Sequence, residues 1–325
     1  MREPVIDLAE VSVLFKPRGF LSVLQRSGSG VRAMESVSLS LRAGETIGVV
    51  GESGSGKSTL GRVAIGLIAP TRGEVSVDGG ALSDLLHHDF RETRRRLQMV
   101  VQNPFGSLTP WMTIGNAIAE GLEYHHITQT PSETSARVAD LLALVGLEPA
   151  HQSRYPREFS GGQRQRIAIA RALALDPEVL VCDEVTSALD VSIRAQIVNL
   201  LASIKERRPI SYLFITHDLH VARTISDRTA VMYSGRVVET GAAESVFSSP
   251  AHPYTQELIA ALPTLGSTTR VSRNRIALAD VAVSGCPYAP RCPHRMPMCT
   301  SSYPPPTALV GDHTVNCFLY GEKPA

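Results

Sequence analysis

The sequence lacks any long apolar run and any surplus of one charge. None of its apolar stretches approaches the roughly 20 residues that a transmembrane helix needs, and no apolar segment typical of a signal peptide follows Met1. The net charge of +1 leaves no broad basic field that would attract nucleic acid. We therefore expect a protein of the cytosol or of the cytosolic membrane surface that binds no nucleic acid.

Cysteine is almost absent until the end of the chain. Of five cysteines, Cys182 stands alone in an apolar run and four fall within the last forty residues. A cytosolic chain seldom keeps disulfides, so a cluster of this kind indicates metal binding first. Because free cysteine is often buried, Cys182 is interpreted as core packing.

The remaining composition is that of an ordinary globular protein. Apolar residues make up 43% and charged residues 19% of 325 residues, which is longer than one average domain. The densest basic run, from Arg91 to Arg96, is interpreted as the solvated face of a helix.

Hydrophobic periodicity predicts alternating strands and helices. Strands are expected at 5–15, 37–41, 46–50, 74–77, 179–182, 212–215 and 229–232, and helices at 58–67, 192–205 and from Leu219. Residues 113–174 are expected to be mostly helical. This order predicts an α/β core with a largely parallel sheet and an inserted helical subdomain. Periodicity is lost after Leu262, so we predict one domain over 1–262 and a small cysteine-rich extension over 263–325.

A phosphate-binding loop follows the strand at 46–50. The segment from Gly51 to Thr59 satisfies GxxxxGK[ST], and it lies between an expected strand and an expected helix. Glycines let backbone N–H groups surround a polyphosphate, and the helix N-terminus favours anions. Lys57 would neutralise the β- and γ-phosphates, and the Ser58 hydroxyl would bind Mg²⁺. The nucleotide-binding residues predicted here are Gly51, Ser53, Gly54, Gly56, Lys57, Ser58 and Thr59.

Polar residues follow three other apolar strands. Asp183 and Glu184 end the strand at 179–182, His217 follows the strand at 212–215, and Gln102 follows Met99 to Val101. Ligands bind at the carboxyl ends of strands in such sheets. Asp183 should therefore hold Mg²⁺, Glu184 should polarise the attacking water, His217 should contact the γ-phosphate, and Gln102 should sense Mg²⁺ and the water.

A further segment, FSGGQRQR over residues 159–166, gives the pattern its specificity. Together with the phosphate loop and the Asp-Glu pair, it resembles the signature of ABC transporter ATP-binding subunits. The resemblance implies an ABC-type P-loop NTPase fold and ATP hydrolysis with ATP and Mg²⁺. Gln102 then matches the Q-loop glutamine, His217 the switch histidine, and Asp190 the D-loop, while Phe15 is the candidate to stack on adenine.

The resemblance also implies that each nucleotide is shared between subunits. In this family, a turn corresponding to Ser160, Gly161, Gly162 and Gln163 faces the phosphate loop of a partner ATPase subunit. Two subunits then enclose two ATP molecules, and hydrolysis lets the dimer open.

Several other segments are similar to oligopeptide and dipeptide permease ATPases. They are QNPFGSLTP from Gln102, SALDVSIRAQIVNL from Ser187, and AHPYT from Ala251. The similarity implies an importer ATPase, on the cytoplasmic face of the inner membrane, that works with two permease subunits, an extracytoplasmic solute-binding protein and a second, different ATPase subunit. Peptides are the expected solute, with nickel or another small solute as the alternative. Val185 departs from the family, where proline is usual.

The C-terminal cysteines offer four thiolate ligands. Cys286, Cys292, Cys299 and Cys317 are separated by five, six and seventeen residues, wider than a typical zinc knuckle. Such sets hold zinc or an iron–sulfur cluster. Some similar permease ATPases carry a four-iron cluster here, so the resemblance favours 4Fe-4S, with zinc or no metal as alternatives and His294 as a weaker candidate ligand.

Two alternative functions, an ATPase acting on ribosomes or DNA and a regulator without hydrolysis, fit the sequence less well. ABC ATPases that act on ribosomes or DNA usually carry two cassettes or a long coiled coil, and this chain has one cassette and no sustained heptads. A regulator without hydrolysis is disfavoured because Lys57, Asp183 and Glu184 are all present.

Overall fold

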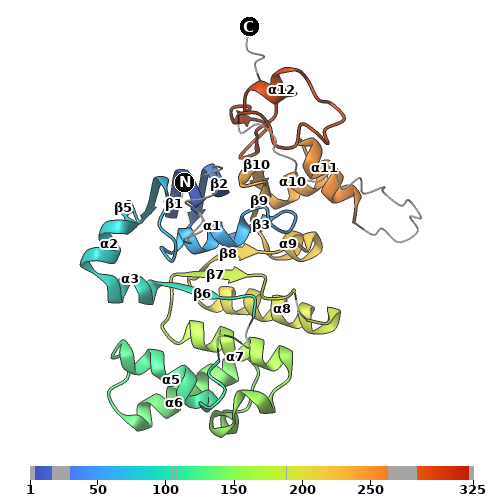
Figure 1. The fold of residues 1–325 in the computed structure, drawn as a ribbon. Coiled ribbons are helices and arrows are strands. Elements are labelled where there is room, and N and C mark those ends of the chain that lie inside the picture. The colour runs from blue at the N-terminus through green and yellow to red at the C-terminus, as the bar shows by residue number, and fades with distance from the viewer. Residues whose placement is uncertain are drawn as a thin grey trace, which may run out of the picture.

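A computed structural model describes residues 4–16, 30–103, 106, 108–187, 189–262 and 284–321. The described chain forms two sheets, a helical block at one end and a tail at the other (Figure 1). The α/β core and the inserted helical block predicted from the sequence are both present.

The larger sheet has eight strands in the order β11-β12-β10-β9-β3-β8-β7-β6. Its central pairs, from β9 to β6, are parallel. These strands are short and largely buried, as expected for a parallel sheet covered on both faces. They span β3 (Thr46–Val50), β6 (Leu97–Val100), β7 (Val179–Asp183), β8 (Ser211–Ile215) and β9 (Arg228–Tyr233).

The smaller sheet is antiparallel and has four strands, in the order β2-β1-β4-β5. Its strands are β1 (Pro4–Phe15), β2 (Val31–Arg42), β4 (Arg72–Val77) and β5 (Gly80–Ala81). The sequence predicted three of these strands but not that they form a sheet of their own.

Two hydrophobic clusters lie on opposite faces of the parallel strands. Along β7, Val179 and Val181 join the cluster beneath α1 (Lys57–Ala64), while Leu180 and Cys182 join the cluster of the helical block. The alternation follows from the two-residue period of a strand. Cys182 is fully buried, as predicted.

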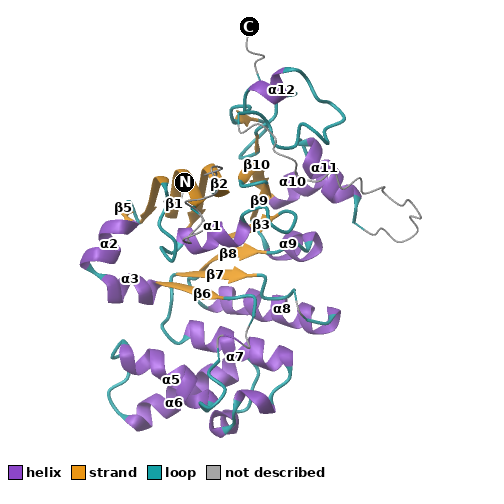
Figure 2. Cartoon of the chain, in the orientation of Figure 1, coloured by secondary structure: helices purple, strands orange, loops and turns teal. Residues whose placement is uncertain are grey.

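The helical block contains α5 (Ile114–Tyr124), α6 (Pro131–Leu144) and α7 (Gly161–Leu173), which lie together beyond β6 (Figure 2). Thr113 and Thr130 cap α5 and α6, and each side chain accepts a backbone N–H of the first turn. The other helices of the core are α2 (Leu82–His88), α3 (Phe90–Arg96), α8 (Val191–Arg207) and α9 (Leu219–Ile225).

The basic run is not a simple solvated face. Arg94 donates to the carbonyls of Ile65 and Gly66, at 2.8 and 2.9 Å, just past the end of α1. The helix ends at Ala64 instead of Leu67, before the left-handed φ of 69° at Gly66. Arg96 forms ion pairs with Asp78 and Glu178. Two arginines of this run therefore make specific contacts while staying partly exposed.

The C-terminal part packs against the end of the large sheet. It contains α10 (Ala243–Ser248), α11 (Pro253–Ala260), α12 (Met298–Ser301), β11 (Thr307–Ala308) and β12 (Thr314–Val315). β12 pairs with β10 (Arg236–Ala242), and Cys286, Tyr288 and Phe318 share a hydrophobic cluster with Tyr233. The boundary at residue 262 stays a prediction. Among the described helices, none combines the length and apolar character needed to cross a membrane.

Candidate active site

The phosphate loop lies between β3 and the N-terminus of α1, and Lys57 is its buried centre. Its Nζ donates to the carbonyls of Gly51 and Glu52, at 2.9 and 2.7 Å, and contacts the Ser55 hydroxyl at 3.3 Å. Burial lowers the pKa of Lys57, while the charges of Glu184 and Asp183 oppose that shift. The Lys57 ammonium group could therefore exchange its hydrogen bonds to the backbone carbonyls for hydrogen bonds to polyphosphate oxygens.

Asp183 lies at the carboxyl end of β7, and only 2% of its surface is exposed. Its Oδ1 accepts a hydrogen bond of 2.8 Å from Ser58 Oγ. Burial raises the pKa of Asp183, against the opposing effects of the Ser58 bond and the Arg62 charge. A hydroxyl and a carboxylate in contact are hard oxygen donors of the kind that Mg²⁺ prefers, so the residues present fit that ion.

Glu184 is held in an unusual backbone conformation. Its φ of 49° lies in the left-handed region, its N–H donates to Ile215 O at 2.9 Å, and Ser187 Oγ donates to its carbonyl at 2.9 Å. Such conformations cost energy and cluster at functional sites. Here the conformation turns the side chain toward the ends of the neighbouring strands.

Two predicted partners meet the Glu184 carboxylate. Gln102 Nε2 donates to Oε2 at 2.8 Å, and His217 Nδ1 lies 3.5 Å from Oε1. The three residues follow β6, β7 and β8, so parallel strands bring them to one edge of the sheet. The structure thus brings together Gln102, Glu184 and His217, and, beside them, Lys57, Ser58 and Asp183.

The turn at Ser160 is a second, separate helix N-terminus. Ser160 caps α7: its Oγ accepts the Gln163 N–H at 3.3 Å, and Gln163 Oε1 accepts the Ser160 N–H at 3.0 Å. Among the described residues, no hydrogen bond or ion pair joins this turn to the phosphate loop. Asp190, at the N-terminus of α8, is exposed, and Phe15, at the end of β1, is 44% exposed. Their roles at the nucleotide stay predictions.

The four C-terminal cysteines line one small cavity of about 20 Å³. Burial raises the pKa of Cys286 to about 11, and burial also raises the pKa of Cys292 and Cys317. Four thiols are suitable donors for zinc or for an iron–sulfur cluster. However, the described ranges contain no group of three or more His, Cys, Asp or Glu residues placed closely enough to hold a metal ion. The donor chemistry fits a metal, but the spacing in this structure does not.

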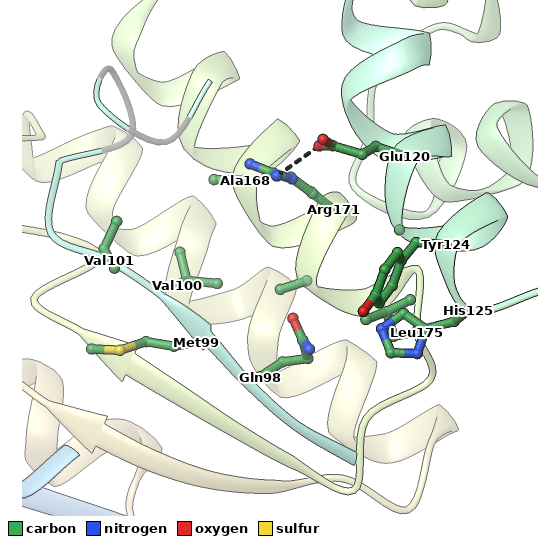
Figure 3. Close-up of a pocket in the computed structure, with 12 residues that line it drawn as sticks. Gln98, Met99, Val100, Val101, Glu120, Tyr124, His125, Ala168, Arg171 and Leu175 are labelled. Atoms are coloured by element: carbon green, nitrogen blue, oxygen red, sulfur yellow. Dashed lines mark hydrogen bonds and ion pairs between the residues drawn. The ribbon is translucent and has the colours of Figure 1, made fainter. Parts of the chain in front are cut away.

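A larger cavity, of about 400 Å³, separates the helical block from β6. Figure 3 shows Glu120 and Tyr124 of α5 facing Arg171 of α7 and the strand residues 98–101, with an ion pair of 3.1 Å between Arg171 and Glu120. Its strand wall ends at Val101, the residue before Gln102.

Sequence reasoning missed one contact of the phosphate loop. The hydroxyl of Tyr254, a fully buried side chain, accepts the N–H of Glu52 at 2.9 Å. Tyr254 lies in the segment AHPYT, whose resemblance to permease ATPases does not by itself indicate a contact with the phosphate loop.

Comparison with known families agrees with this geometry. Residues 34–187 match the ABC transporter family, and residues 238–299 match the C-terminal region of oligopeptide/dipeptide transporters.

Relatives and solved structures resemble the chain over most of its length. A putative peptide import ATP-binding protein of Brucella abortus is 46% identical and covers 89% of this chain and 87% of its own length. The oligopeptide transport ATP-binding protein AppF of Bacillus subtilis is 44% identical over 98% of both chains. The ATP-binding cassette MJ0796, solved as a dimer in a post-hydrolysis state with ADP and Pi, superimposes with a TM-score of 0.64 at 30% identity, covering 73% of this chain and 98% of its own.

Proposed function

The chain belongs to the ABC transporter ATP-binding proteins, and on that premise we propose that its ATP hydrolysis drives the import of di- or oligopeptides through separate membrane permeases. The observation that carries the ATPase function is the meeting of Lys57, the Ser58–Asp183 pair and Glu184 at one sheet edge. Peptides are favoured over nickel because the relatives described above are named for peptide transport.

Each residue at that edge has a proposed role. Lys57 binds the β- and γ-phosphate oxygens. Ser58, Asp183 and Gln102 hold Mg²⁺, which when bound neutralises charge on the phosphates. Glu184 orients a water and takes its proton while the water oxygen bonds to the γ-phosphorus and the bond to the β-phosphate oxygen breaks. His217 contacts the γ-phosphate.

The remaining nucleotide contacts are proposed to come from a second ATPase subunit. Among the described residues, the Ser160–Gln163 turn has no hydrogen bond or ion pair with its own phosphate loop, and a helix N-terminus of this kind binds phosphate. Two further residues are proposed to contact nucleotide: Asp190 of the D-loop, and Phe15, whose ring would stack on adenine. A heterodimer with a different ATPase subunit is the proposed assembly.

We place the permease contact at the 400 Å³ cavity. It lies between the helical block and the core, and its strand wall ends beside Gln102, whose amide contacts Glu184. A permease segment seated there would shift Gln102 and so report transport to the site of hydrolysis. The proposed location is the cytoplasmic face of the inner membrane, with an extracytoplasmic protein delivering the solute.

We further propose that Cys286, Cys292, Cys299 and Cys317 bind a 4Fe-4S cluster, with zinc as the alternative. The support is their shared cavity, and binding requires the loops to draw the thiols closer than they lie here. Protein purified without oxygen should contain iron and acid-labile sulfide. Zinc alone would favour the alternative, and neither metal would end the proposal.

The transport function is tested by reconstitution. The chain is assembled with its permeases, partner ATPase and binding protein in lipid vesicles, with a Glu184→Gln assembly as control. We expect added peptides, and not Ni²⁺, to stimulate ATP hydrolysis and to enter the vesicles. Stimulation by Ni²⁺ alone would contradict the peptide assignment.

A further inference from the structure

The outer side of the phosphate loop contacts the cysteine-rich tail. Glu52 is the second residue of the loop, and its two carboxylate oxygens each lie 3.3 Å from Nη1 of Arg291. Arg291 immediately precedes Cys292 in the tail. The two partners of this ion pair are 239 residues apart in the sequence. A contact of this kind gives the tail direct access to the loop that binds phosphate.

Arg291 is held in position by a second carboxylate. Its Nη2 lies 2.6 Å from Glu257 Oε1, and Tyr288 donates its hydroxyl to the other oxygen of Glu257 at 2.5 Å. One guanidinium therefore bridges Glu257 of α11 and Glu52 of the loop. A planar fork of donors suits this task better than an ammonium group. The Arg291 side chain is 22% exposed, less than either of its partners.

The packing around this bridge is aromatic. The rings of Tyr233, Tyr254 and Tyr288 lie with centroids 4.5 to 5.6 Å apart, and the Tyr254 hydroxyl also binds the backbone N–H of Glu52. Glu52 is thus fixed twice from outside the loop, once through its backbone and once through its side chain.

The charges give this arrangement a direction. An uncompensated carboxylate beside a polyphosphate site repels the anion that the site must bind. Burial acts to lower the pKa of Arg291, but the bond to Glu257 and the charge of Glu52 outweigh it and raise that pKa overall. Arg291 therefore stays cationic and neutralises Glu52 at every working pH.

We propose that Arg291 is a positioning residue for ATP, which neutralises Glu52 and holds it outward, so that the affinity of the phosphate loop for nucleotide depends on the C-terminal tail. The proposal rests on ATP binding at this loop, as set out above. It goes beyond that function because it assigns the tail a part in nucleotide binding. Arg291 lies between Cys286 and Cys292, two of the cysteines that line one cavity of the tail.

The test separates ATP binding from turnover. In Arg291→Gln, we expect KM for ATP to rise about 3- to 5-fold, as for loss of one partly exposed ion pair, with kcat within about twofold of the wild type. Arg291→Lys should give an intermediate KM, since one ammonium cannot serve both carboxylates.

The decisive variant adds Glu52→Gln to Arg291→Gln. With the carboxylate gone, no repulsion remains, and KM should return to within about twofold of the wild type. A structural loss of the tail would not be repaired by this second change. Asp312→Asn serves as the matched control, because it removes another ion pair between tail and core, Arg42–Asp312 at 3.1 Å, away from the loop.

The proposal is overturned if Arg291→Gln leaves KM unchanged, if the double variant is no better than the single one, or if Asp312→Asn raises KM equally. All these kinetics are measured on the chain assembled with its partner ATPase subunit and permeases. A wild-type assembly without ATPase activity would instead defeat the proposed function, so the two failures are distinguishable.

Discussion

The turn before α1 and the turn before α7 are both glycine-containing helix N-termini, but Gly56 of the first is required by its own chain, whereas Gly161 of the second is not. Gly56 has a φ of 100°, and a Cβ there would lie 2.5 Å from Ala33 O. At Gly161, φ is ordinary and the nearest atom to a Cβ would be Leu189 Cδ2, at 3.9 Å. The fold explains the first glycine and leaves the second without an internal reason.

The two turns also differ in the residues that surround them. The first lies against Asp183 and the residues around Glu184, whereas the second is packed with the helical block on the other face of the sheet. This difference is what the proposed function requires, in which one chain holds the catalytic residues and also a second turn that serves a neighbouring subunit. The predictions below test this division.

The largest effect is expected at Glu184. Glu184→Gln keeps the shape of the side chain and removes the base, so ATP turnover should fall about 10²- to 10⁴-fold while nucleotide binding persists. Turnover assays and equilibrium binding of ATP measure the two properties separately. Equal ATPase activity in variant and wild type would remove Glu184 from the mechanism.

Gly161→Ala separates the two turns most sharply. Because a Cβ fits within the chain, the variant should melt at or above the wild-type temperature, yet ATPase activity of the assembled subunits should fall about 10- to 100-fold as the methyl group displaces the partner's nucleotide. Gly56→Ala is the matched control and should destabilise the isolated chain, because its φ of 100° strains any side chain. Full activity in Gly161→Ala would contradict the division of roles.

A smaller effect, on thermal stability, is expected at Asp183, which lies beside the turn before α1. Burial raises the pKa of Asp183 in the folded chain above its pKa in the unfolded chain. As the pH rises from the unfolded-state pKa to the folded-state pKa, the unfolded chain loses the proton first, and the free energy of unfolding falls. Asp183→Asn should remove this cost and raise Tm at neutral pH by about 2 to 4 °C in EDTA.

Asp183→Asn carries a second readout. Thermal unfolding from acid to neutral pH should be flatter in the variant, and Mg²⁺ with ATP should stabilise only the wild type. A lower Tm for the variant in EDTA would refute the assigned cause.

Much of the catalytic site around Lys57 and Glu184 was predictable from the sequence, because the topology of the sheet determines where its residues lie. Short buried strands followed by Lys57, Asp183, Glu184 and His217 must deliver those residues to one edge of a parallel sheet, and the strands at 46–50 and 179–182 are found within one residue. Local patterns were sufficient because each residue lies next to the strand that positions it.

The rest depends on contacts between distant segments. The pairing of β12 with β10 and the Arg291–Glu52 ion pair join segments with no shared local pattern. The cysteines show the same limit: their spacing predicted a common site, and they do line one cavity, but spacing alone did not fix the separation of the thiols.

The most direct test of the account is the ATP-dependent association of the Glu184→Gln chain, alone and with its partner ATPase subunit, measured as molar mass by light scattering. We predict a stable dimer at saturating ATP that is absent with ADP and is weakened when Gly161→Ala is added to this chain. A mass that stays monomeric with ATP in both mixtures, or a dimer indifferent to nucleotide and to Gly161, would contradict the account.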